Sequence, residues 1–175
     1  LYDGDDTSVA AFSVSAWDGE FASSSPVTVN VNVSVPKFVD LTASISSNVR
    51  LPSSVIAGAG TRIRMPVTIS NIGGLTPAGN QRIDVRILAR SGDGTETLLH
   101  TARDVSISRL KPGGSLRHRW TVRLPLGMAA GTYRLVVQVD AANDVSESNE
   151  SNNEAVTTRT IAVERGFIDL TGVFD

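Results

Sequence analysis

The chain has 175 residues, a hydrophobic fraction of 41% and a formal net charge of −2 at pH 7. This length allows one full domain with part of another, and the composition is sufficient for a packed core. The charge balance excludes a strong general attraction to nucleic acid or to an anionic membrane. The absence of cysteine excludes disulfides, cysteine-ligated zinc and thiol catalysis. No stretch approaches the roughly 18 consecutive apolar residues of a membrane span.

Alternation of apolar and polar residues recurs along the chain and predicts half-buried strands. The alternating stretches are residues 27–35, 62–69, 82–87, 116–124 and 133–139, and two further strands are expected at about 41–47 and 155–163. Glycine-rich turn signals separate them, at 57–60, 71–80, 91–94 and 111–114. Short strands at this spacing, each with one polar face, predict an all-β antiparallel sandwich rather than a parallel α/β fold.

A short motif that occurs twice in the sequence indicates tandem modules. "FVDLT" begins at Phe38 and "FIDLT" at Phe167, 129 residues later, and each follows a predicted strand. We therefore expect residues 39–165 to form one complete module and residues 166–175 to be a linker with the first strand of a next repeat. Residues 1–38 would be the C-terminal hairpin of a preceding module. Because two strands cannot close a core, this hairpin is expected to pair with the main module or with a neighbouring chain.

Four motifs in residues 39–165 resemble CARDB, the cell-adhesion-related domain found in bacteria. They are "VDLTASIS", "GTRIRMPVTISNIG", "LKPGGSLRHRWTV" and "GTYRLVVQVDAANDVSESNESNN". The resemblance implies an immunoglobulin-like sandwich of about seven strands in a large bacterial surface or secreted protein. The stretch 86–106 departs from the family pattern and leaves the strand count open. Residues 1–38 are similar to the last hairpin of bacterial cadherin-like or Ig-like repeats.

The stretch "DAANDVSESNESNN" at 140–153 is the richest in carboxylates and amides. Calcium prefers six to eight oxygen ligands, and the candidate ligands are Asp140, Asn143, Asp144, Glu147 and Glu150. The spacing lacks the glycine of an EF-hand loop. The alternative is a hairpin connection in which polar side chains bond the backbone, with Asn149, Asn152 and Asn153 holding the turn.

A candidate ligand surface consists of Trp17 and the outward-facing Arg117, Arg119 and Arg123. Further arginines are predicted to face outward on other strands: Arg62, Arg64, Arg82, Arg86 and Arg134. Such a surface could bind an anionic glycan or an acidic neighbouring module. The alternative is that these arginines give solubility and protect strand edges, and that Trp17 fills a junction between modules.

The resemblance to CARDB implies a non-catalytic structural or adhesive module that acts as a stalk or spacer outside the cell or on its surface. No catalytic residues and no required cofactor are predicted, because no nucleophile elbow or other catalytic constellation is recognisable. The expected partners are neighbouring modules and a glycan or protein ligand, without nucleic acid or membrane insertion. Two alternatives stay open: a glycan- or protein-binding module, and an accessory domain of a secreted hydrolase.

Overall fold

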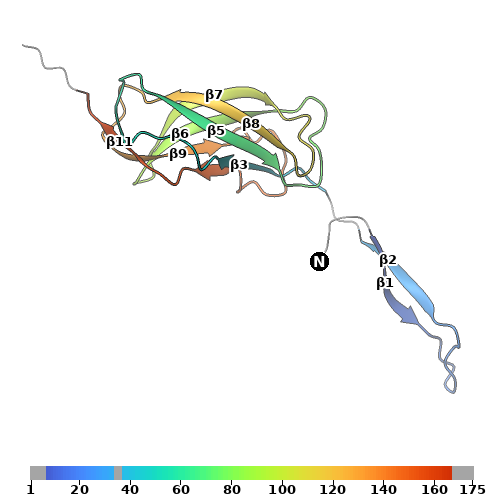
Figure 1. Ribbon diagram of the computed structural model, residues 1–175. Coiled ribbons are helices and arrows are strands. Elements are labelled where there is room, and N and C mark those ends of the chain that lie inside the picture. The colour runs from blue at the N-terminus through green and yellow to red at the C-terminus, as the bar shows by residue number, and fades with distance from the viewer. Residues whose placement is uncertain (1–6, 34–36, 167–175) are drawn as a thin grey trace, which may run out of the picture. The chain divides into compact units, whose positions relative to one another are not determined.

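The computed structural model describes residues 7–33 and 37–166, which belong to two compact units divided between Lys37 and Phe38. The regular structure of both units is strand (Figure 1). Within these two described ranges, no helix is present that could cross a membrane. The expected linker and first strand of a next module, apart from Gly166, lie outside the described residues.

The first unit contains a β-hairpin of β1, Thr7–Val14, and β2, Val27–Val33. Its connection is closed by Asp18, whose Oδ1 accepts hydrogen bonds from the N–H groups of Glu20 at 3.0 Å and Phe21 at 2.8 Å. The side chains of Phe12, Trp17 and Phe21 in this unit are more than half exposed. The assignment of this hairpin to a preceding module stays a prediction.

The second unit is a sandwich of two sheets, which confirms the predicted all-β fold. One sheet has the order β3-β5-β8, and the other has the order β4-β11-β9-β6-β7, with β10 also paired to β9. The bounds are β3 Leu41–Ile45, β4 Ser54–Ile56, β5 Arg62–Asn71, β6 Arg82–Ser91, β7 Glu96–Ser106, β8 Ser115–Arg123, β9 Gly131–Gln138, β10 Glu154–Val156 and β11 Ile161–Glu164. All pairs are antiparallel except β4 with β11.

The alternating apolar residues form the core between the two sheets, as predicted. In β5 the inward residues Ile63, Met65, Val67 and Ile69 are at most 1% exposed. In β8 only Val122 is equally buried, and its other inward residues are half-buried. The reason is that β8 lies at the edge of its sheet, where fewer neighbours cover each side chain. The rings of His118 and Trp120 stack there, with centroids 4.8 Å apart.

Two stretches differ from the prediction. The single strand expected at 155–163 is two strands, β10 and β11, interrupted at the buried Thr157. There the Thr157 hydroxyl accepts from Leu135 N–H at 3.0 Å and donates to Arg159 C=O at 2.9 Å, replacing regular pairing. The divergent stretch 86–106 continues β6 and then forms β7, so it adds an edge strand to the large sheet.

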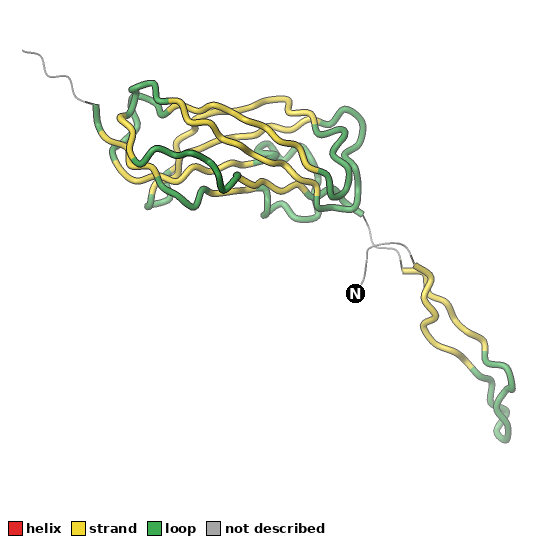
Figure 2. Tube along the Cα trace, in the orientation of Figure 1, coloured by secondary structure: helices red, strands yellow, loops and turns green. Residues whose placement is uncertain are grey.

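The chain enters and leaves the sandwich at opposite ends. The last strand, β11, pairs Val163 with Gly131 at the start of β9. Val39 at the entry instead pairs with Glu147, in the loop after the other end of β9. Eight residues of strand separate these ends by roughly 25 Å. Figure 1 shows β11 at the end opposite the chain entry, and Figure 2 shows loops gathered at both ends.

Candidate functional site

The polar loop 140–153 connects β9 to β10. Hydrogen bonds to its first residue, Asp140, fix the first half of the loop. Asp140 has the left-handed φ of 49°, and its carbonyl accepts from Asn143 N–H at 2.9 Å. The two carboxylate oxygens of Asp140 accept from Asp144 N–H and Val145 N–H, each at 2.9 Å. Val145 is 2% exposed, so this closure inserts an apolar residue of the loop into the core. The first half of the loop therefore has a defined shape.

The second half of the loop fastens the segment that enters the sandwich. Glu147 forms a parallel bridge with Val39, and Ser148 N–H donates to Val39 C=O at 3.0 Å. The Glu147 carboxylate accepts from the backbone N–H of Leu41 through Oε2, and from Asn153 Nδ2 at 2.9 Å through Oε1. Glu147 is 9% exposed. A buried carboxylate thus satisfies the first N–H of β3.

Asp40 accepts hydrogen bonds from two further polar side chains of the loop. Its carboxylate accepts from Ser148 Oγ at 2.6 Å and from Asn152 Nδ2 at 2.7 Å. Asn149 stays within the loop, where its Oδ1 accepts from both the N–H and the hydroxyl of Ser151. The Oδ1 atoms of Asn152 and Asn153 are buried and receive no hydrogen bond in the described structure.

Asn71 completes this end of the sandwich and was not among the predicted site residues. It is fully buried at the end of β5. Its Oδ1 accepts from the N–H groups of Asp40 and Gly73, while Nδ2 donates to the carbonyls of Leu75 and Leu110. These four bonds use the full capacity of the amide. The signal in the sequence is that Asn71 has the same alternation parity as the buried Ile63, Met65, Val67 and Ile69.

Burial changes the acid–base properties of two loop carboxyls. Desolvation raises the pKa of Glu147 to about 7, although hydrogen bonds from Leu41 and Asn153 act in the opposite direction. Desolvation also raises the pKa of Asp140, again against its backbone hydrogen bonds. Nearby Glu150 adds repulsion at both groups. Burial of the loop therefore disfavours negative charge at the two residues that organise it.

The five candidate calcium ligands do not form a cage in the described residues. Asp140 and Glu147 each use both carboxylate oxygens as acceptors of protein N–H groups. Asn143 and Asp144 are exposed, and Glu150 accepts from Glu147 N–H at 2.9 Å. Across residues 7–33 and 37–166, no group of three or more histidine or acidic side chains is placed to hold a metal ion. The arrangement fits the predicted hydrogen-bonded connection better than the predicted calcium site. Loop 140–153 and Asn71 together hold residues 39–41, and we call them the clasp.

The predicted ligand surface is divided between the two units. Trp17 is 69% exposed in the hairpin unit. Arg117, Arg119 and Arg123 are exposed on β8 of the sandwich, beside Arg62 and Arg64 of β5. The structure thus brings the arginines of two neighbouring strands together.

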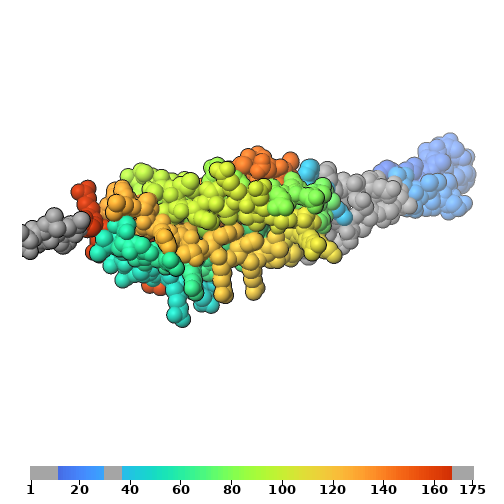
Figure 3. Space-filling view, turned by 90° about the horizontal axis from the view of Figure 1, so that it is seen from above, coloured from blue at the N-terminus to red at the C-terminus, as the bar shows by residue number. Residues whose placement is uncertain are grey.

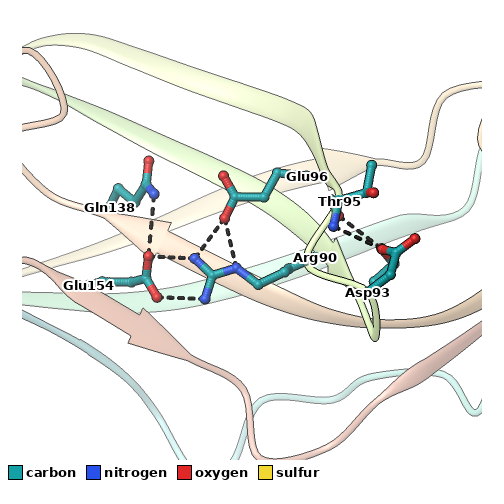
Figure 4. A network of polar contacts seen from close by, with 7 residues as sticks. Arg90, Asp93, Thr95, Glu96, Gln138 and Glu154 are labelled. Atoms are coloured by element: carbon teal, nitrogen blue, oxygen red, sulfur yellow. Dashed lines mark hydrogen bonds and ion pairs between the residues drawn. The ribbon is translucent and has the colours of Figure 1, made fainter.

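On the other sheet, the positive charge of Arg90 is balanced by two carboxylates. Arg90 of β6 donates through Nε to Glu96 at 2.7 Å, and through its two terminal nitrogens to both oxygens of Glu154 at 2.8 and 2.6 Å (Figure 4). Gln138 also donates to Glu154, at 3.3 Å. The hydrogen bond from Arg90 lowers the pKa of Glu154. This network links β6, β7, β9 and β10 across the outer face of the large sheet.

Comparison with known proteins gives one family and several solved structures. The CARDB family model matches residues 38–157. The crystal structure of the CARDB domain of the PF1109 protein from Pyrococcus furiosus, in complex with di-metal ions, has 27% identity and a TM-score of 0.50, covering 74% of this chain and 97% of that one. A domain of a protein described as a cell surface protein from Methanosarcina acetivorans has 26% identity and a TM-score of 0.46, covering 73% and 93%. No curated protein matches the chain.

Proposed function

Because the chain belongs to the CARDB family, we propose that it is a non-catalytic structural and adhesive module of an extracellular or cell-surface protein, where it acts as a spacer. The observation that carries this proposal is the position of the two ends. A chain that enters at Val39 and leaves after β11, at the opposite end of β9, adds the length of the sandwich to a tandem array. A domain with adjacent ends would add little length.

The clasp at the entry supports a load-bearing role. Tension applied to a tandem chain acts on the sandwich at its entry, residues 39–41, and at its exit, β11. Loop 140–153 and Asn71 hold these three residues with hydrogen bonds to backbone and side chains. The exit is held by β11, which pairs with both β4 and β9. Both ends are therefore fastened by segments distant in the sequence.

Single-molecule force spectroscopy of the full chain, pulled from its two termini, tests the spacer proposal. We expect the sandwich to resist and then to unfold in one force peak that releases the whole second unit. A variant with a weakened clasp, Asn71→Ala, should unfold at lower force. Gradual extension without a force peak would contradict the proposal, because a spacer must keep its length under load.

A calcium site at the loop and a role beside a secreted hydrolase are the alternatives to this proposal. The metal ions in the Pyrococcus furiosus structure are a property of that protein. In this chain the carboxylates of Asp140 and Glu147 already have N–H partners, which favours the hydrogen-bonded form of the loop.

A further inference from the structure

The outer face of the three-stranded sheet carries five arginines. Arg62 and Arg64 of β5, with Arg117, Arg119 and Arg123 of β8, are all exposed. The strands β3, β5 and β8 contain no aspartate or glutamate. In Figure 3, long side chains of the teal and orange stretches project from the lower edge of the sandwich. A chain whose net charge is −2 therefore has one strongly cationic face.

The register places these arginines in a regular ladder. Residues directly opposite each other in an antiparallel pair point to the same face. The four consecutive outward pairs are Arg117 with Thr68, Arg119 with Pro66, Thr121 with Arg64, and Arg123 with Arg62. Successive outward pairs are about 7 Å apart, so the ladder presents a cation at every step over roughly 20 Å. We call these five residues the arginine ladder.

Nothing in the described structure neutralises the ladder. Among residues 7–33 and 37–166, none of the five arginines has an ion pair or a side-chain hydrogen bond. Arg62 and Arg123 are directly opposite each other, an arrangement that is unfavourable for like charges. Arg90 on the other sheet, by contrast, has two carboxylate partners. A like-charged row without counter-charges lowers stability unless an external anion compensates for it.

The residues between the arginines indicate the chemistry of that anion. The outward positions beside the ladder are mostly hydroxyl side chains: Thr42, Ser44, Thr68, Ser70, Ser115 and Thr121. The described face has no exposed aromatic residue, so it lacks the stacking platform that single-stranded nucleic acid requires. It also lacks the apolar centre of a typical protein interface. Guanidinium groups bind carboxylate and sulfate in a bidentate manner, and hydroxyls bind the hydroxyls of sugars.

We propose that the arginine ladder binds a linear anionic polysaccharide, with carboxylate or sulfate groups, laid along β5 and β8. Beside the ladder is an open hollow of about 520 Å³, and its lining includes Arg50, Arg62, Arg64 and Arg119. A sugar unit of the polymer that enters this hollow contacts three arginines of the ladder. The polymer supplies the counter-charges that the protein itself does not. This role would make the module a surface-bound adhesin as well as a spacer.

Binding of the full chain to defined polymers tests the proposal. The probes are heparin for sulfate, polygalacturonate for carboxylate, dextran as a neutral polymer and polyglutamate as an acidic polypeptide. We expect binding to heparin, to polygalacturonate or to both, and the preferred polymer identifies the anionic group. Binding should weaken between about 0.05 M and about 0.5 M sodium chloride, because the ladder is exposed to solvent and salt screens it.

A matched pair of variants locates the binding site. The triple variant Arg64→Ser, Arg117→Ser and Arg119→Ser removes three steps of the ladder, and should weaken binding about tenfold or more. The control variant Arg86→Ser, Arg103→Ser and Arg134→Ser removes the same charge from exposed positions on the other sheet, and should bind as the wild type does.

Four results would overturn the proposal: no binding to either anionic polysaccharide, equal binding to dextran, stronger binding to polyglutamate, or equal loss in the two triple variants. None of them would affect the spacer function, which does not depend on these arginines.

Discussion

The carboxylate of Glu147 accepts a hydrogen bond from the backbone N–H of Leu41, a residue 106 positions earlier in the chain. Glu147 lies in the last long loop of the sandwich, and Leu41 is the first residue of its first strand. The bond is buried and is reinforced by Asp40, Ser148 and Asn152. The start of the domain is thus held by a segment near its end.

The Glu147→Gln variant tests the raised pKa of Glu147. Its folded-state pKa of about 7 lies above the ordinary value of 4.5, so the protonated form favours the folded state. The stability that the protonated Glu147 adds is fully present below pH 4.5. This stability is lost as the pH rises through about 7, and the loss is at most about 3 kcal/mol. Glutamine cannot ionise, so we expect the stability of the variant relative to the wild type to increase by at most about 3 kcal/mol from pH 4.5 to pH 8. The NH₂ group of glutamine faces either Leu41 N–H or Asn153 Nδ2, and this lowers the stability of the variant by the same amount at every pH.

The measurement is the free energy of unfolding in urea at several pH values, compared between the two proteins. Desolvation lowers the pKa of His118 and raises that of Asp140, and both effects are present in both proteins. The difference between the two curves therefore reports Glu147 together with its repulsion by Asp140 and Glu150. A difference that does not vary with pH would contradict the assignment.

Asp140→Asn is expected to destabilise the sandwich by about 1–3 kcal/mol. Asparagine tolerates the left-handed backbone of Asp140 and keeps one acceptor oxygen. Its NH₂ group is a donor that faces either Asp144 N–H or Val145 N–H, so one of the two hydrogen bonds is lost. The matched control is Asp144→Asn, because the Asp144 side chain is exposed, and this change should stay within about 0.5 kcal/mol. Thermal and urea unfolding measure both; similar effects for the two variants would argue against the closure by Asp140.

Asn71→Ala removes an amide that makes four buried hydrogen bonds, and should cost more than about 3 kcal/mol. The control is Asn48→Ala, at an exposed turn, with an expected effect within about 0.5 kcal/mol. Urea unfolding at neutral pH gives both values. A loss below about 1 kcal/mol for Asn71→Ala would mean that water replaces these bonds, which contradicts their structural role.

Gly73→Ala tests the close approach of the entering segment. A Cβ at Gly73 would lie 2.6 Å from Asp40 N and 2.8 Å from Val39 C, and would also meet Phe38 C=O. Because these are backbone atoms, the segment must move and loses bonds of the clasp. At the exposed Gly92, by contrast, an added Cβ would meet no heavy atom within 4 Å. Hydrogen exchange should show faster exchange at Leu41 in Gly73→Ala, and unchanged exchange at Leu41 in Gly92→Ala.

Calcium is expected to leave the melting temperature unchanged at millimolar concentration, since the loop carboxylates already accept protein hydrogen bonds. Scanning calorimetry with calcium chloride and with magnesium chloride measures this. A shift with calcium alone that is lost in Glu150→Gln would instead assign the loop as a calcium site, with Glu150 among its ligands.

The local alternation of the sequence was enough to predict much of the fold. Period-two patterns place Ile63, Met65, Val67 and Ile69 inside and Arg62 and Arg64 outside, because successive side chains of a strand point to opposite faces. The polar stretch 140–153 was correctly predicted as a connection between strands. The CARDB resemblance of these motifs is confirmed by the family match over residues 38–157.

Relationships between distant segments were decided only by the tertiary structure. The partner of Glu147 is Leu41, and the partners of Asn71 include Asp40, because strand order brings these segments to one end of the sandwich. The pairing of β5 with β8 likewise converts separate outward arginines into one ladder. Alternation sets the direction of a side chain from its own strand, whereas hydrogen bonds and charge clusters depend on which strands become neighbours and in which register.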